Sequence, residues 1–184
     1  QGRDGKLAHP HQTSWGVSTR LIGAIIMVHG DDNGLVLPPY VAPTQVVIIP
    51  IAAHKPNVLP AARNLLASLK ETGLRVALDE TDKTPGFKFA EAEMKGIPLR
   101  IELGPRDIEN GTCVLVKRHN GEKIIVKQDE LNEQIPVILK QIHNEMYEKA
   151  HRFLLSRIKD AHSFDELKEI VDNVIKYFGC YSAE

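Results

Sequence analysis

Residues 45–51 read Gln45-Val46-Val47-Ile48-Ile49-Pro50-Ile51, a continuous apolar run from which the fold class can be inferred. An unbroken run of β-branched residues predicts a central strand of a sheet that is covered on both faces. Beyond it, the pattern predicts a helix over 57–72, a strand over 74–78 and a helix over 87–95. This alternating order predicts strands that lie in one sheet with helices packed against it.

Three further strands are predicted downstream. Residues 99–103 alternate apolar and charged side chains, which predicts a strand buried on one face only. Residues 113–118 and 123–127 flank an Asn-Gly pair at 120–121, a strong signal of a β-hairpin. We therefore predict an α/β fold with a mixed five-stranded sheet and flanking helices.

The predicted hairpin contains a charge conflict. A two-residue turn at Asn120-Gly121 would place His119 opposite Glu122, and Arg118 opposite Lys123. Like charges directly opposite each other destabilise a pair of strands. Such a pair is tolerated where an anion such as an RNA phosphate binds. The alternative is that both long side chains extend into water, where exposed charges interact weakly.

The two flanks of the sheet differ in pattern. After Asp129, apolar residues recur at helical spacing to about Lys159, and a capping box at Ser163 starts a second helix. Before the sheet, Thr19 to His29 fits a mostly buried helix, and the prolines that follow indicate a boundary near residue 42. We predict three parts, 1–42, 43–130 and 131–184.

The composition is that of an ordinary globular protein. The 184 residues include 23 Lys plus Arg and 24 Asp plus Glu, so the formal net charge is −1. This balance excludes both a disordered chain and a histone-like basic nucleic-acid binder. The neutral total conceals an asymmetry: residues 83–127 hold nine bases and six acids, whereas 129–176 hold seven bases and ten acids. A local basic patch for nucleic acid therefore stays open.

The cysteine count, the apolar stretches and the histidines indicate the compartment and the absence of special sites. Two cysteines, Cys113 and Cys180, do not make a disulfide scaffold, so a reducing compartment is favoured. The longest apolar stretch, 21–28, is too short to cross a bilayer. His9 and His11 form a His-x-His pair without further ligands nearby, so we predict no metal there. Cys113 lies within a predicted strand, which favours a buried core position.

A loop of small residues precedes the first predicted helix. Residues 13–19 are rich in Ser, Thr and Gly, and Arg20 follows at the helix start. Helix N-termini bind anions and an Arg adds a bidentate contact, so this is a candidate phosphate site. An ordinary Gly/Ser loop with a surface Arg would have the same composition.

Two motifs follow each other along the chain, QTSWGVSTRLIGA at 12–24 and PGFKF with GIPLRIELGPRD between 85 and 107. Together they resemble the prolyl-tRNA synthetase family of the archaeal/eukaryotic-like type. Residues 12–24 (QTSWGVSTRLIGA), continued by 27–39, resemble the third signature motif of these class II enzymes. Residues 85–89 (PGFKF) and 96–107 (GIPLRIELGPRD) resemble the family's anticodon-binding domain. The resemblance covers nearly the whole chain and implies a class II anticodon-binding fold for its central part.

The resemblance also implies an activity and its substrates. Enzymes of this family activate proline with ATP and Mg²⁺ and then esterify it to tRNA(Pro). Arg20 matches the catalytic arginine that binds the ATP γ-phosphate, and Gln12 and Ser18 match further ATP-binding positions. An Arg at a helix start suits this role, because it can balance phosphate charge during displacement.

The anticodon readers are likewise implied by the resemblance. The family's guanine-reading positions match Glu93 and Arg100, and Arg106 stands where a basic residue is expected. A further basic contact aligns with Glu122, and Lys123 is its neighbour. The two phenylalanines of the PGFKF motif, Phe87 and Phe89, suit either base stacking or the core.

The chain also departs from the complete family pattern. Motifs 1 and 2 and the proline pocket do not occur in it, so we expect the end of a catalytic domain (1–42), an anticodon-binding domain (43–130) and the helical start of a C-terminal domain (131–184). We expect this part alone to be inactive and to need no cofactor. The full enzyme is expected to be a cytoplasmic homodimer without membrane contact. Cys180 matches the first of four zinc cysteines, and because one thiol cannot hold zinc, we predict no metal.

Two alternatives remain at this point. One is a stand-alone RNA-binding module with the anticodon-domain fold and no aminoacylation. The other is an unrelated nucleotide-binding enzyme, which is the weakest because neither a P-loop nor a G-x-G-x-x-G motif is present. Residues 13–23 discriminate the first from a synthetase, because a binding module needs no catalytic motif.

Overall fold

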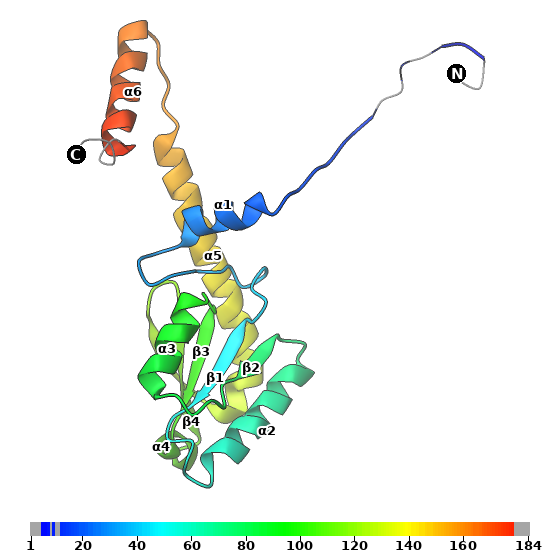
Figure 1. The fold of residues 1–184 in the computed structure, drawn as a ribbon, viewed down its shortest axis with the longest axis vertical. Helices are drawn as coiled ribbons and strands as arrows, with labels where there is room; N and C mark the ends of the chain where they lie inside the picture. The colour runs from blue at the N-terminus through cyan, green and yellow to red at the C-terminus, as the bar shows by residue number, and fades with distance from the viewer. Residues whose placement is uncertain (1–4, 8, 10–11, 179–184) are drawn as a thin grey trace.

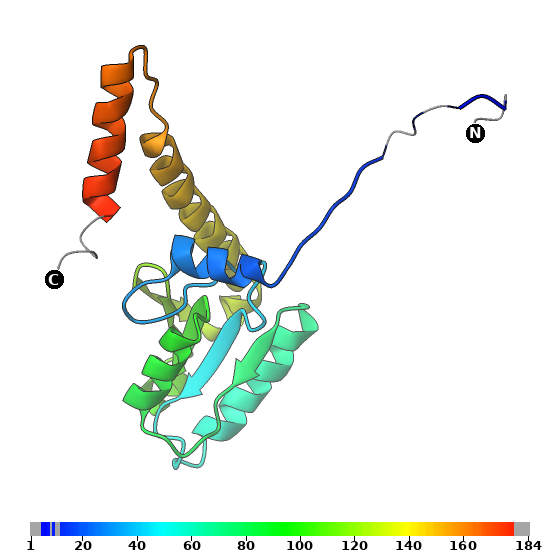
Figure 2. The same ribbon diagram turned by 45° about the horizontal axis from the view of Figure 1, so that its top comes forward.

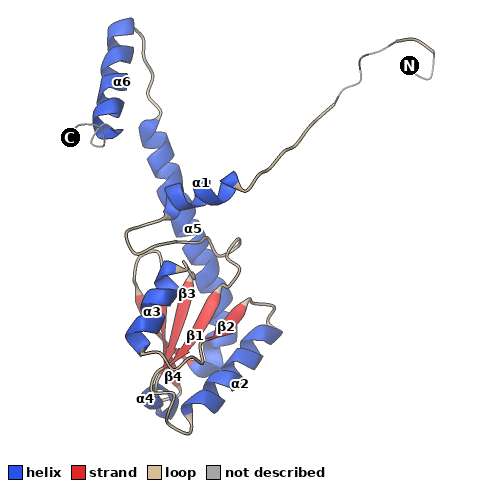
Figure 3. Ribbon diagram, viewed as in Figure 1, coloured by secondary structure: helices blue, strands red, loops and turns tan. Residues whose placement is uncertain are grey.

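A computed structural model describes residues 5–7, 9 and 12–178. The strands form a single sheet, and the helices lie around it (Figures 1 and 3). The elements are, in order, α1 (Arg20–His29), β1 (Val46–Pro50), α2 (Val58–Glu71), β2 (Val76–Leu78), α3 (Pro85–Met94), β3 (Leu99–Leu103), α4 (Pro105–Glu109), β4 (Thr112–Lys117), β5 (Lys123–Lys127), the 3₁₀ turn η1 (Gln128–Glu130), α5 (Leu131–Arg157) and α6 (Phe164–Phe178).

The predicted mixed five-stranded sheet is confirmed. Its strand order is β2-β1-β3-β4-β5, with β1 parallel to both of its neighbours. β3, β4 and β5 pair antiparallel. The short helix α4 connects β3 to β4, and it was not predicted from the apolar pattern because five residues are too few to show a helical period.

The core lies on one face of this sheet. Ile48, Ile101 and Leu115 point from three adjacent strands toward α2 and α5, and each is fully buried. On the opposite face, Val47 and Ile49 pack against α3. β1 is therefore covered on both faces, as its unbroken apolar run predicted. The expected core position of Cys113 is confirmed by its complete burial, which raises the pKa of its thiol to about 12.

The strand β3 differs from its prediction. It was expected to be buried on one face, yet all five of its residues are buried, and Arg100 and Glu102 are each only 8% exposed. The reason is that β3 lies in the middle of the sheet, where α3 covers the second face, and that the two charged side chains pair with each other there.

Helix α1 also differs from its prediction. It forms where expected, but none of its residues is buried, and Met27 is 83% exposed. α1 lies across α5, which extends well beyond the sheet (Figures 1 and 2). Much of the apolar surface of α1 is therefore exposed in the described part of the chain. No helix of the described part is both long and apolar enough to cross a membrane.

Candidate functional site

A pocket of about 350 Å³ opens at the C-terminal end of α3. Its walls come from four parts of the chain: the linker after α1, the end of α3, the start of β3 and the loop between β4 and β5. We call it the hairpin pocket, and its charged lining residues are Asp31, Glu93, Arg100, Lys117 and Arg118, with His119 beside them.

Arg100 occupies a fixed position in this pocket. Its Nη1 donates to Oε1 of Glu93 at 2.9 Å, and its Nε donates to Oε1 of Glu102 at 3.0 Å. Its guanidinium carbon lies 4.3 Å from the centre of the Phe89 ring. The Arg100 side chain is 9% exposed, whereas that of Glu93 is 39% exposed. Glu93 therefore offers acceptor capacity to a ligand directly beside the N–H groups of Arg100.

The register of the sheet explains how Lys123 relates to Arg100. Arg100 pairs with Val116, and Val116 pairs with Lys123, so the three side chains stand in one row on the α3 side of the sheet. Lys123 is exposed at the edge, two strands from Arg100, which is about 10 Å between backbones at ordinary strand spacing.

The connection between β4 and β5 corrects the predicted two-residue turn. Val116 pairs with Lys123, and the Lys117 N–H donates to the Glu122 carbonyl at 3.0 Å. The loop therefore has four residues, 118–121, and closes through a Gly121 with φ of +72°. The expected contact between Arg118 and Lys123 does not form, because the longer loop takes Arg118 out of the strand pair.

Arg118 was not among the predicted site residues, and it is firmly held in the pocket. Its Nη1 and Nη2 donate to the two carboxylate oxygens of Asp31 at 2.7 and 2.6 Å, and its Nε donates to the Glu93 carbonyl at 2.9 Å. The hydrogen bonds from Arg118 lower the pKa of Asp31 to about 2. No sequence pattern signals this pair, because its members lie 87 positions apart.

The rest of the loop wall is held by helix α5. The Nζ of Lys117, whose side chain is 1% exposed, lies 2.8 Å from Glu122 and 3.8 Å from Glu145. His119 Nε2 lies 2.5 Å from the Glu145 carboxylate. Burial acts to raise the pKa of Glu145, but the hydrogen bonds from His119 and Gln141 outweigh it and lower that pKa.

Other predicted site residues lie elsewhere. Arg106 is exposed on α4, which follows the opposite end of β3, and it does not line the hairpin pocket. Gln12, Ser18 and Arg20 are exposed before and at the start of α1, where the Ser18 hydroxyl lies 3.4 Å from the Arg20 N–H. None of these three lines the pocket.

The aromatic and metal predictions can be placed in part. Phe87 is 55% exposed with Lys83 above its ring, whereas Phe89 is half-buried and lies against Arg100. In the part of the chain that the structure describes, no three His, Cys, Asp or Glu side chains converge to hold a metal. His11 and Cys180 lie outside the described residues, so the absence of zinc stays a prediction.

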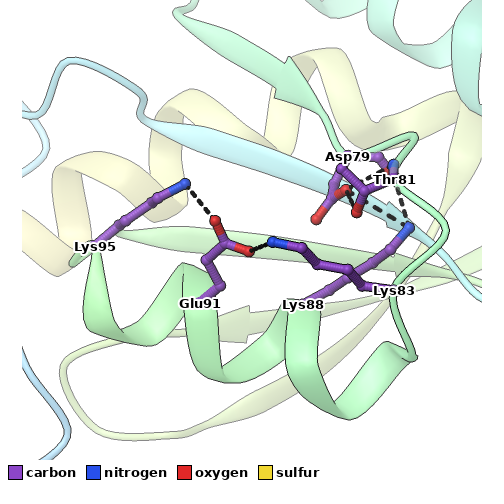
Figure 4. Close-up of polar contacts among 6 residues, drawn as sticks. All are labelled: Asp79, Thr81, Lys83, Lys88, Glu91 and Lys95. Carbon is purple, nitrogen blue, oxygen red and sulfur yellow. Dashed lines mark hydrogen bonds and ion pairs between the residues drawn. The ribbon is translucent and has the colours of Figure 1, made fainter.

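A second pocket, of about 280 Å³, is lined by residues of β1, β2, the segment after β2 and α3, and we call it the Lys88 pocket. Figure 4 shows the charged side chains in and beside it. The Lys88 side chain is 2% exposed, and its Nζ donates to the Asp79 carbonyl at 3.0 Å and lies 3.6 Å from the Asp79 carboxylate. Glu91 accepts hydrogen bonds from Lys83 and Lys95, both at 2.8 Å, which lower the pKa of Glu91 to about 2.

The two pockets differ in the charged groups that line them. The hairpin pocket has three lining cations (Arg100, Lys117, Arg118) against two carboxylates, Asp31 and Glu93. The Lys88 pocket has two lining cations against the carboxylates of Asp79, Glu80 and Glu91. Ion pairs with Glu102, Glu122 and Glu145 offset the cations of the hairpin pocket, so its distinguishing feature is the partly exposed Glu93 carboxylate beside Arg100.

Comparison with known proteins identifies the family of this chain. The family described as "Anticodon binding domain" matches residues 45–137. A proline–tRNA ligase of Agathobacter rectalis is 56% identical over 170 residues, which cover 92% of this chain and 35% of that protein. Proline–tRNA ligase 2 of Bacillus cereus (strain ATCC 14579) is 54% identical over 170 residues, covering 92% and 36%. The chain thus spans about a third of the length of these curated relatives.

Proposed function

This chain belongs to the anticodon-binding domain family, and from that membership we propose that it reads the anticodon of tRNA(Pro) as part of a proline–tRNA ligase. The hairpin pocket is the proposed reading site. The observation that carries the proposal is the pair of Glu93 and Arg100, 2.9 Å apart, where the pocket meets the sheet.

The chemistry of this pair complements guanine. The anticodon for proline carries two guanines, and a guanine in a single-stranded loop exposes its O6 and N7 acceptors together with its N1–H and N2–H donors. Arg100 supplies donors and Glu93 supplies acceptors at one place. The salt bridges of Arg100 keep these groups oriented before the RNA arrives, which reduces the conformational entropy lost on binding.

Two more basic residues have proposed roles. Lys123 shares a sheet face with Arg100 and is exposed, which supports a contact with the RNA backbone beside the pocket. Arg106 is exposed on α4 and lies outside the pocket lining, so its proposed contact is also with phosphate rather than with a base. Phosphate contacts position the RNA without reading its sequence.

For the longer enzyme we propose activation of proline with ATP and Mg²⁺, with Arg20 as the catalytic residue and Gln12 and Ser18 beside the nucleotide. Arg20 is exposed at the N-terminus of the ten-residue helix α1, which supports a phosphate contact. Residues 12–20 contain no carboxylate, so Mg²⁺ ligands would come from ATP and from groups outside this segment. A homodimer, a cytoplasmic location and the division at residues 42 and 130 belong to the same proposal.

A stand-alone RNA-binding module is the second candidate function. It would use the same pocket, but it would not require the segment before residue 45. The similarity to proline–tRNA ligases extends over 92% of the chain, well beyond the family range of 45–137, and this favours the ligase.

The test compares two RNA stem-loops in a gel-shift assay. One carries the proline anticodon, and in the other both of its guanines are replaced by adenines. We expect at least about tenfold tighter binding of the guanine form, since one good bidentate base contact contributes about 1–3 kcal/mol. Equal binding of the two RNAs would contradict the proposal. The chain alone is expected to show no proline-dependent ATP–pyrophosphate exchange.

A further inference from the structure

We propose that Arg118 is a positioning residue that ties the linker after α1 to the loop carrying Glu93, and that it thereby controls selection of the anticodon base. This inference deepens the proposed function and rests on it for the RNA measurement. The linker here is residues 31–37, and we call residues 93–98, the last two residues of α3 and the turn that follows them, the reading loop.

Arg118 holds both ends of the reading loop. Its Nε donates to the Glu93 carbonyl at 2.9 Å, and its backbone N–H donates to the Pro98 carbonyl at 2.9 Å. Its two remaining guanidinium nitrogens hold the Asp31 carboxylate at 2.7 and 2.6 Å. Only 5% of the Arg118 side chain is exposed, so these charge-assisted bonds are largely shielded from solvent.

The linker lies directly on the reading loop. The Leu35 N–H donates to the Met94 carbonyl at 3.1 Å, and the Leu37 N–H donates to the Gly96 carbonyl at 3.2 Å. A Cβ at Gly34, where φ is +126°, would meet the Met94 backbone at 2.7 Å. A Cβ at Gly96, where φ is +69°, would meet the Leu35 backbone at 2.7 Å. Because Gly34 and Gly96 have no side chains, the backbone of the linker can lie directly against the backbone of the reading loop.

These contacts converge on Glu93. Arg100 holds its carboxylate, and Arg118 holds its carbonyl, so both its side chain and its backbone are fixed by cations. Discrimination between bases requires functional groups held to within about 0.5 Å. Arg118→Ala keeps the backbone bond to Pro98 but removes the side-chain bond to the Glu93 carbonyl, and it leaves the Asp31 carboxylate without its guanidinium partner.

The molecule contains a matched control for this pair. Arg63 also binds a carboxylate through two nitrogens, at 2.7 and 3.2 Å from Glu80. The side chains of that pair are 61% and 42% exposed, and neither residue lines the hairpin pocket. Arg63→Ala therefore removes the same chemistry from a surface site.

The first measurement needs no RNA. Amide hydrogen exchange in the full chain is compared for wild type, Arg118→Ala, Arg118→Lys and Arg63→Ala. We expect Arg118→Ala to accelerate exchange at Leu35 and Leu37 by at least tenfold, and Arg63→Ala to leave it unchanged. Arg118→Lys is expected to restore little, because an ammonium cannot reproduce the planar fork. If the Leu35 and Leu37 amides of Arg118→Ala exchange at the wild-type rate, the proposed link between the linker and the reading loop is overturned.

The second measurement is the ratio of affinities for the guanine and adenine stem-loops. We expect Arg118→Ala to reduce this ratio about tenfold, mainly by weakening binding of the guanine stem-loop. Arg63→Ala is expected to preserve the ratio. An unchanged ratio would overturn the positioning role. If the wild-type chain binds the guanine and adenine stem-loops equally, the proposed function fails. The exchange measurement still shows whether Arg118 links the linker to the reading loop. If Arg118→Ala does not fold, both measurements are made on Asp31→Asn, which weakens the same ion pair at an exposed position.

Discussion

The hairpin pocket and the Lys88 pocket share a wall, because Ala92 and Ile97 line both, yet their charged groups are used differently. In the Lys88 pocket, the ion pairs join α3 to the segment just before it, with Lys88 on Asp79 and Glu91 between two lysines. In the hairpin pocket, Arg118 joins segments far apart in the chain, and Glu93 retains acceptor capacity. A cluster of charged side chains is thus a candidate binding site only where its ion pairs leave donors or acceptors that a ligand can still reach.

The largest expected effect is on stability, and it belongs to the Lys88 pocket. Lys88→Ala removes a fully buried ammonium from the partly buried Asp79 carboxylate, which should lower the free energy of unfolding by about 3 kcal/mol. Urea denaturation measures this change. The guanine-to-adenine affinity ratio should stay at the wild-type value. A reduced ratio with unchanged stability would reverse the roles of the two pockets.

The next effect sharpens the role of the hairpin pocket. Arg100→Ala should weaken binding of the guanine stem-loop by about 1–3 kcal/mol, because a guanine contact is lost. Gel-shift titration measures it, with the adenine stem-loop as the matched RNA control. Arg100→Lys should recover only part of the loss, since lysine lacks the bidentate geometry. Wild-type affinity in Arg100→Ala would remove Arg100 from the reading site.

A smaller effect is expected at the exposed margin of the hairpin pocket. Lys123→Ala should weaken both stem-loops alike and reduce the slope of log affinity against log salt concentration by about one, as for a single phosphate contact. Titrations at several salt concentrations test this. If the loss is confined to the guanine RNA, Lys123 reads a base and the hairpin pocket extends farther across the sheet than proposed.

The smallest effect concerns pH and the exposed face of the Lys88 pocket. The hydrogen bonds from Lys83 and Lys95 lower the pKa of Glu91 from 4.5 to about 2, so the ionised carboxylate stabilises the fold at neutral pH. This contribution should be fully present above pH 4.5 and disappear as the pH falls toward 2. Glu91→Gln should therefore lose less stability than wild type over that range in urea denaturation. Parallel pH curves for the two proteins would exclude the ion pairs as a source of stability.

Much of the fold could be predicted because its signals are local. The apolar run at 46–49 predicted a strand covered on both faces, and the Asn120-Gly121 pair predicted the hairpin. The alternation around Arg100 placed its side chain opposite to those of Leu99 and Ile101, as the register bears out. The loop length was wrong because turn type depends on the backbone of the whole connection, which a dipeptide signal does not specify.

The residue pattern alone was enough to predict the five strands and all of the helices except the short α4, the family resemblance, and the candidate pair of Glu93 and Arg100. These follow from periodicity and motif, which act over a few neighbouring residues. Three features became known from the fold: Arg118 binds Asp31 across 87 positions, β3 is buried on both faces, and Arg106 lies away from the hairpin pocket. The physical reason is that a side chain's partners depend on which elements pack beside it, and that packing is a property of the whole fold.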